Sequence, residues 1–108
     1  MTGGFALWVR FTTLDATAAQ QFDALVARTL EGIRHETGTL IYAVHTPEAE
    51  PLVRCFYELY ADRAAFDAHE AQQHTKDMLR ERAQYLASTE VTFLSELTGK
   101  RPSPPAVS

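Results

Sequence analysis

The sequence predicts an α+β fold, because strand-like and helix-like hydrophobic patterns alternate along the chain in the order β-α-β-β-α-β. Residues 5–12 and 52–60 alternate their side chains with the period of a strand. Residues 17–33 repeat apolar side chains every three or four positions, as an amphipathic helix does. A hairpin between two crossover helices predicts a ferredoxin-like βαββαβ domain, with an antiparallel sheet in the order 4-1-3-2 and both helices on one face.

The first strand and helix have clear signals. Thr17-Ala-Ala-Gln20 fits a capping box at the start of the helix. Behind it, the apolar stripe consists of Phe22, Leu25, Val26, Leu30 and Ile33. We expect Gly38 to end the connection with a positive φ.

The second half of the chain repeats this plan after a hairpin. The expected strands are 39–46 and 52–60, joined by a turn at 47–51. Asp62 is expected to cap a helix over 63–72, followed by a helical stretch over 74–86 and a last strand over 89–98. We expect one domain over residues 1–99, with a proline-rich, disordered tail over 100–108.

The strand patterns also predict which face the helices cover. The face expected beneath the helices carries Phe5, Leu7, Val9 and Phe11 of the first strand with Val53, Cys55, Tyr57 and Leu59 of the third. The opposite face then carries Trp8, Phe56 and Tyr60 among Arg10, Arg54 and Glu58. Because three large aromatic side chains are costly to leave in water, a homodimer packed sheet on sheet is expected. The alternative is a monomer with a solvated aromatic face.

Composition and charge exclude several classes of function. The 108 residues carry a net charge of -4 without a basic cluster, which argues against nucleic acid and anionic membranes as partners. No apolar run is long enough for a signal peptide or a membrane span, so a cytoplasmic protein is expected. The single cysteine, Cys55, excludes an intramolecular disulfide and is expected to pack in the core.

Two histidines are candidates for chemistry. His69 follows Phe66 by three positions, which places it on the buried side of its helix, and His74 begins the next helical stretch. A spacing of five puts them about 140° apart on a continuous helix, so one helix cannot chelate a metal with both. With no third ligand evident, no metal site is expected. One imidazole could instead be a general base in a pocket between helix and sheet, or both could be structural.

Other polar and aromatic residues admit two interpretations. Glu58 has Arg10 on a neighbouring strand as its expected ion-pair partner. Tyr42, Tyr57 and Phe66 could line an aromatic pocket or fill the core and interface.

Two segments carry a resemblance to a known family. The run from Cys55 to His69, with His74 five residues later, and the run Glu36-Thr-Gly38-Thr-Leu-Ile-Tyr42 resemble the antibiotic biosynthesis monooxygenases. The resemblance implies a dimeric α+β barrel that oxidises quinols or anthrones with O₂ and without metal, haem or flavin. It implies His69 and His74 as base or hydrogen-bond donor, and Glu58 as a residue that orients the pocket. Tyr42, Tyr57 and Phe66 would form the pocket wall.

Two other classes of function remain open. One is an isomerase acting on a small metabolite, for which Arg10 and Arg54 would be the central cations. The other is a non-catalytic dimeric module that binds a small hydrophobic molecule. The binding module predicts that replacing His69 or His74 leaves the affinity for the ligand intact and that no turnover is found.

Overall fold

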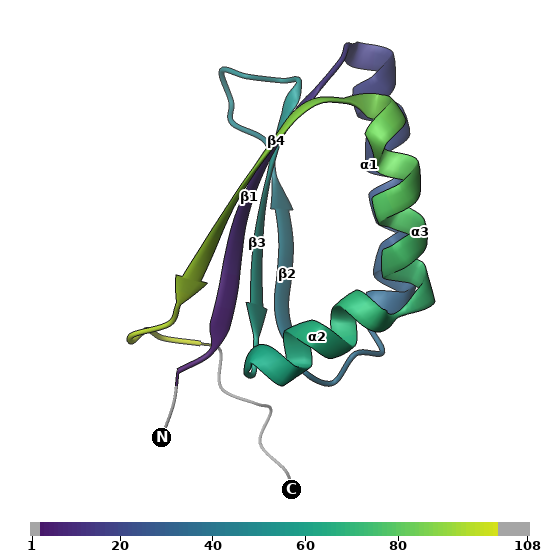
Figure 1. Cartoon of the computed structure of the whole chain (residues 1–108). Coiled ribbons are helices and arrows are strands. Elements are labelled where there is room, and N and C mark those ends of the chain that lie inside the picture. Colours follow the sequence, from purple (N-terminus) through teal and green to yellow (C-terminus); the bar gives the residue numbers. More distant parts are fainter. Residues whose placement is uncertain (1–2, 102–108) are drawn as a thin grey trace, which may run out of the picture.

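A computed structural model describes residues 3–101, in which helices cover one face of a four-stranded antiparallel sheet (Figure 1). The elements are β1 (Phe5–Thr13), α1 (Ala16–Ile33), β2 (Thr39–His45), β3 (Val53–Tyr60), α2 (Arg63–Ala71), α3 (Gln73–Arg82), the 3₁₀ turn η1 (Ala83–Tyr85) and β4 (Leu86–Ser95). The strand order β2-β3-β1-β4 confirms the predicted ferredoxin-like topology. Most of the expected tail, residues 102–108, lies outside the described residues.

Aspartates begin both crossover helices. Asp62 caps α2 as predicted, and its side chain accepts a hydrogen bond from the Ala65 backbone N–H at 2.8 Å. For α1 the predicted capping box at Thr17 is wrong. Asp15 has the extended backbone of an N-cap and accepts from the Ala18 N–H at 2.8 Å, so the helix begins before Thr17.

The last helix is shorter than expected and the last strand begins earlier. Instead of continuing to residue 86, α3 ends at Arg82, and Leu86 already pairs with Thr13 of β1. A register shift between Thr12 and Thr13 lets β4 start there, which the hydrophobic pattern alone does not indicate. Among residues 3–101, no helix combines the length and apolarity needed to cross a bilayer.

The register of β1 and β3 corrects the predicted faces of the sheet. Leu7 lies opposite Glu58 and Val9 opposite Phe56, and directly opposed residues of an antiparallel pair share a face. Arg54, Phe56, Glu58 and Tyr60 therefore face the helices, whereas Cys55 and Tyr57 face outward with Trp8. The prediction was right for β1 and wrong for β3, because alternation within one strand does not say which face is buried.

The outer face is consequently less aromatic than expected. Trp8 is 41% exposed there, but Phe56 and Tyr60 are fully buried beneath the helices. Two of the three aromatic side chains that motivated a sheet-on-sheet homodimer therefore lie in the core of one chain. The homodimer stays a prediction.

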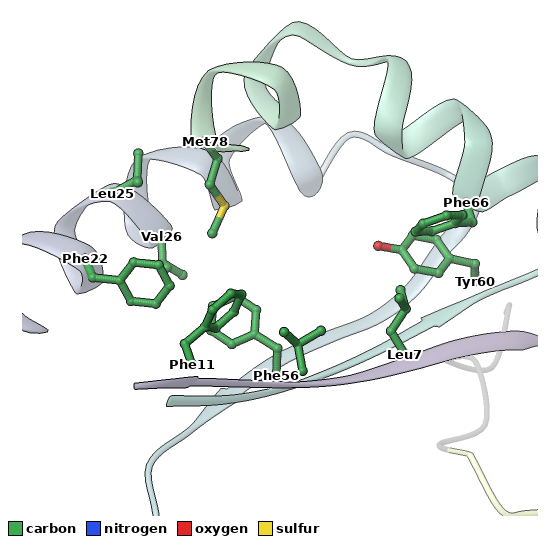
Figure 2. Close-up of a cluster of buried hydrophobic side chains, with 10 residues drawn as sticks. Leu7, Phe11, Phe22, Leu25, Val26, Phe56, Tyr60, Phe66 and Met78 are labelled. Carbon is green, nitrogen blue, oxygen red and sulfur yellow. The ribbon is translucent and has the colours of Figure 1, made fainter. Parts of the chain in front are cut away.

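The core lies between α1 and the sheet. Figure 2 shows Phe22 and Val26 of α1 facing Phe11 and Phe56 of the central strands. The Phe11 and Phe56 rings meet edge to face with centroids 4.9 Å apart, and Phe22 lies 5.2 Å from Phe11. Burial of these rings supplies much of the free energy that holds helix to sheet.

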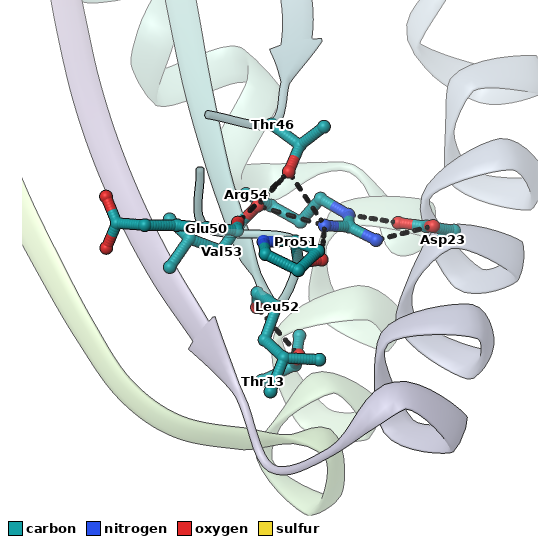
Figure 3. A network of polar contacts seen from close by, with 8 residues as sticks. All are labelled: Thr13, Asp23, Thr46, Glu50, Pro51, Leu52, Val53 and Arg54. Carbon is teal, nitrogen blue, oxygen red and sulfur yellow. Dashed lines mark hydrogen bonds and ion pairs between the residues drawn. The ribbon is translucent and has the colours of Figure 1, made fainter. Parts of the chain in front are cut away.

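Polar contacts also fix the β2–β3 hairpin to α1, at the same end of the sheet as these rings. Figure 3 shows Arg54 of β3 reaching Asp23 of α1, with its Nε and Nη2 atoms donating to the carboxylate at 2.7 and 3.0 Å. Arg54 also donates to the backbone oxygen of Pro51 at 2.8 Å. A bidentate pair of this kind sets orientation as well as adding stability.

Gly38 is needed for a different reason from the one predicted. No glycine among the described residues has a positive φ. A Cβ atom at Gly38 would instead lie 2.6 Å from Cβ of Ala65, so glycine lets the α1–β2 connection pass close to α2.

Replacing Phe22 with alanine is expected to lower the free energy of unfolding by about 3–5 kcal/mol, because it leaves a cavity in the core. Leu97→Ala, at a position that is 90% exposed, should change it by less than about 0.5 kcal/mol. Urea unfolding of both variants checks this, and equal losses would contradict the described core.

Candidate functional site

A buried carboxylate brings the two candidate histidines together. Glu36, in the α1–β2 connection, contacts His69 through Oε1, at 2.8 Å from the ring Nδ1, and His74 through Oε2 to the ring Nε2. The Thr39 hydroxyl donates to Oε1 at 2.6 Å. One carboxylate thus connects the end of α1, the start of β2, and helices α2 and α3.

The hydrogen bonds determine the charge of Glu36. Burial by itself would raise the pKa of the Glu36 carboxyl, but hydrogen bonds from Thr39, His74 and His69 outweigh burial and lower that pKa below its usual range. The carboxylate therefore stays ionised at neutral pH and accepts hydrogen bonds from both rings.

A helix break and a glycine make this arrangement possible. Gln72, between α2 and α3, has an extended backbone with φ -70° and ψ 144°. The break turns the chain so that His74 points back toward Glu36, which a continuous helix would prevent. A Cβ atom at Gly32 of α1 would overlap the His74 ring, so glycine is needed there for the ring to pack against α1.

A cavity of about 150 Å³ lies beside His69, between the helices and the sheet. His69 and Phe66 of α2, Tyr42 of β2 and Glu58 of β3 all line it. Val91 and Phe93 of β4 also line it and are 47% and 60% exposed, so the cavity reaches the surface beside β4.

Two of the predicted site residues lie elsewhere. Tyr57 faces the outer side of the sheet, because it pairs with Trp8 rather than with a helix-facing residue of β1. His74 does not line the cavity, and it contacts the cavity's histidine only through Glu36. His69 is thus the candidate base that borders the cavity.

Glu58 is a buried carboxyl in the cavity wall, and its partner differs from the predicted one. Tyr60 donates to Glu58 at 2.6 Å, whereas Arg10 pairs with Glu50 on the other side of the sheet. The predicted Glu58–Arg10 pair is wrong, since the two side chains point to opposite faces. Burial raises the pKa of Glu58, and burial together with the nearby carboxylate raises that of Tyr60.

Sequence reasoning missed three residues of the site. Glu36 lies in a loop with no periodic pattern, although it belongs to a segment that carries the family resemblance. Thr75 and Arg82 line the cavity from α3, on the same helix face as Met78. Helical spacing from Met78, within the stretch predicted over 74–86, could have indicated both. Among residues 3–101, no group of three His, Cys, Asp or Glu side chains is arranged to hold a metal ion.

Replacing Glu36 with glutamine should lower the free energy of unfolding by about 1–3 kcal/mol, because the new amide turns an N–H donor toward a histidine that needs an acceptor. Glu31→Gln is the matched control, since that side chain is exposed and pairs only with Arg34. Urea unfolding near pH 7 measures both. Equal stability of the Glu36 variant and wild type would contradict the described cluster.

The difference in unfolding free energy between wild type and Glu36→Gln should also depend on pH. A pKa that is lower in the folded chain gives stability that is fully present above the unfolded pKa, about 4.3. This stability is lost as the pH falls through the folded-state pKa. The gap in unfolding free energy should therefore shrink as the pH falls below about 4, and a gap that grows there would contradict the assignment.

Comparison with known proteins identifies the family. The family model described as antibiotic biosynthesis monooxygenase matches residues 5–81. A search of curated proteins found no significant match.

Solved structures share the fold at low sequence identity. The "putative antibiotic biosynthesis monooxygenase" of Caulobacter crescentus superposes with a TM-score of 0.83 at 18% identity, covering 90% of this chain and 92% of its own. A protein from Mycobacterium tuberculosis gives a TM-score of 0.82 at 22% identity, covering 91% and 99%. One from Pseudomonas aeruginosa gives 0.80 at 20% identity, covering 91% and 98%. With the family model matching most of its length, the chain belongs to the antibiotic biosynthesis monooxygenase family.

Proposed function

We propose that the protein is a monooxygenase that oxidises a small quinol with O₂ and uses His69 as the general base. The observation that carries this proposal is the contact between His69 Nδ1 and the buried carboxylate of Glu36. A carboxylate at Nδ1 holds the proton on that nitrogen and leaves a lone pair on Nε2. His69 borders the cavity, so Nε2 is the nitrogen offered to a ligand there.

The size of the cavity favours a single aromatic ring. A cavity of about 150 Å³ accommodates a molecule the size of benzene. The wall supplies the aromatic surface such a ring needs, since Phe66 and Tyr42 both contribute to it. A monocyclic quinol therefore fits better than a polycyclic anthrone.

The proposed reaction needs only O₂ as a second substrate. His69 takes the proton of a quinol hydroxyl, and the electron-rich phenolate then reduces O₂ directly. One oxygen atom bonds to a ring carbon and the other leaves as water, so hydroquinone and O₂ give hydroxyquinone and one water. The protein contributes orientation of the ring and a matched proton acceptor.

Glu58 and Tyr42 support the base in this proposal. Glu58 lies buried in the cavity wall, where its carboxyl can accept a hydrogen bond from a substrate hydroxyl. The Tyr42 ring lies 5.9 Å from the His69 ring and limits where a substrate ring can lie. Both side chains then orient the quinol, while His69 alone moves the proton.

The test is oxygen uptake by wild type and His69→Gln on a panel of monocyclic quinols, with the buffer rate subtracted. Loss of a general base should lower the rate by about 10²–10⁴-fold. His45→Gln is the matched control, because that residue is exposed at the end of β2, and it should keep the wild-type rate.

Two results would contradict the proposal. One is uptake in wild type that never exceeds the buffer rate on any quinol. The other is a His69→Gln variant that is folded, as judged by its melting temperature, and equally active. Binding of quinols without turnover would favour the non-catalytic module instead.

A further inference from the structure

Helix α3 turns two polar side chains toward the cavity that have no ion-pair or hydrogen-bond partner among residues 3–101. They are Thr75 in its first turn and Arg82 at its last residue. The two residues are seven positions apart, which is close to two helical turns, so they share one face of the helix. Neither contributes to the Glu36 cluster.

The hydroxyl of Thr75 is buried and unsatisfied. Thr75 is 4% exposed, and its Oγ1 is the one buried side-chain polar atom within the described residues that lacks a hydrogen-bond partner. Native proteins satisfy nearly all such atoms, since leaving one unpaired costs stability. An atom of this kind in a cavity wall indicates a ligand that supplies the missing partner.

Arg82 stands apart from the other arginines. Within the part of the chain that the structure describes, every other arginine forms an ion pair with a carboxylate, for example Arg80 with Asp77 at 2.6 Å. Arg82 forms none, although it is half-buried, and its guanidinium lies 5.1 Å from the centre of the Phe11 ring. Burial lowers the pKa of Arg82, although the nearby Glu58 and Glu70 act to raise it.

The two ends of the cavity therefore differ in chemistry. Arg82 lies over Phe11, whereas His69 lies near Tyr60 and Phe66, with ring centroids 5.2 and 6.5 Å away. Figure 2 shows Phe11 on one side of the space beneath the helices and the pair Tyr60 and Phe66 on the other. A ligand that reaches both ends would carry an anionic group at one end and a hydroxyl at the other.

We propose that Arg82 and Thr75 bind a monocyclic hydroxylated benzoate, with its carboxylate on Arg82 and its phenolic oxygen accepting from the Thr75 hydroxyl beside His69. A guanidinium binds a carboxylate through two parallel hydrogen bonds, which fits a ligand that is already charged when it enters. Glu58 and Glu70 also line the cavity, so their carboxyls would lie near the carboxylate of the ligand. This inference rests on the proposed function, because it names a benzoate carrying the quinol hydroxyls as the substrate class.

The test measures binding without turnover. Meta-hydroxybenzoate, whose groups are spaced as in a quinol that carries a ring carboxylate, and its neutral counterpart, meta-hydroxybenzyl alcohol, are titrated by calorimetry into the full chain in the absence of O₂. Wild type should bind the carboxylate about 10–100-fold more tightly, as expected for a hydrogen bond between charged groups. Arg82→Gln should abolish this preference, whereas Arg80→Gln, on the exposed side of the same helix, should keep it.

A second variant tests whether the Thr75 hydroxyl binds the phenolic oxygen of the ligand. Thr75→Val replaces an unpaired hydroxyl with a methyl group, so the free protein should melt at the same or a higher temperature. Its affinity for meta-hydroxybenzoate should nevertheless fall about 5–30-fold, while its affinity for benzoate, which lacks the phenolic oxygen, should not change. If Thr75 had only a structural role, Thr75→Val would change the affinity for both ligands equally.

Equal affinity of wild type for the acid and the alcohol, or a preference that survives in Arg82→Gln, would overturn the inference. These outcomes are independent of catalysis. If quinols are oxidised but a ring carboxylate confers no preference, the proposed function stands and the benzoate site is wrong. If meta-hydroxybenzoate binds through Arg82 but no dihydroxybenzoate consumes O₂, the binding site stands and the oxidation is wrong.

Discussion

The site depends on one buried carboxylate that accepts hydrogen bonds from three side chains. Glu36 bonds Thr39, His69 and His74, and these belong to different segments of the chain. A buried charge is tolerated only when such donors replace the water it has lost. The same bonds that keep Glu36 ionised hold the α1–β2 connection against α2 and α3, so the position of the catalytic candidate and the packing of the helices have a common cause.

The register between β1 and β3 places Glu58, the second carboxyl of the site. Because Leu7 of β1 lies opposite Glu58 of β3, a carboxyl comes to lie under the helices among aromatic side chains. Tyr60 satisfies part of its hydrogen-bonding capacity. Helices α2 and α3 leave β4 uncovered, and the resulting space becomes a cavity with a polar wall and an apolar mouth. The cavity in which we propose the reaction thus exists because the helices do not pack against β4.

The sequence predicted the topology well and the site in part. Periodicity identified the four strands and the buried faces of α1 and α2, because each depends on local spacing. It also identified His69 as buried. It could not choose the buried face of β3, where both faces carry apolar residues, since only pairing with β1 decides that. Glu36 could not be singled out either, because a loop carboxylate becomes important only when two distant histidines fold onto it.

We propose that Glu36 fixes the proton of His69 on Nδ1 and leaves Nε2 as the base. The most direct measurement is two-bond ¹H–¹⁵N correlation NMR of the imidazole of His69 at neutral pH, assigned with the His69→Gln variant. We expect the neutral Nδ1–H tautomer, with the ¹⁵N shift of Nε2 showing an unprotonated nitrogen. A neutral ring protonated on Nε2 would contradict it, because such a ring could not accept a proton from a ligand in the cavity.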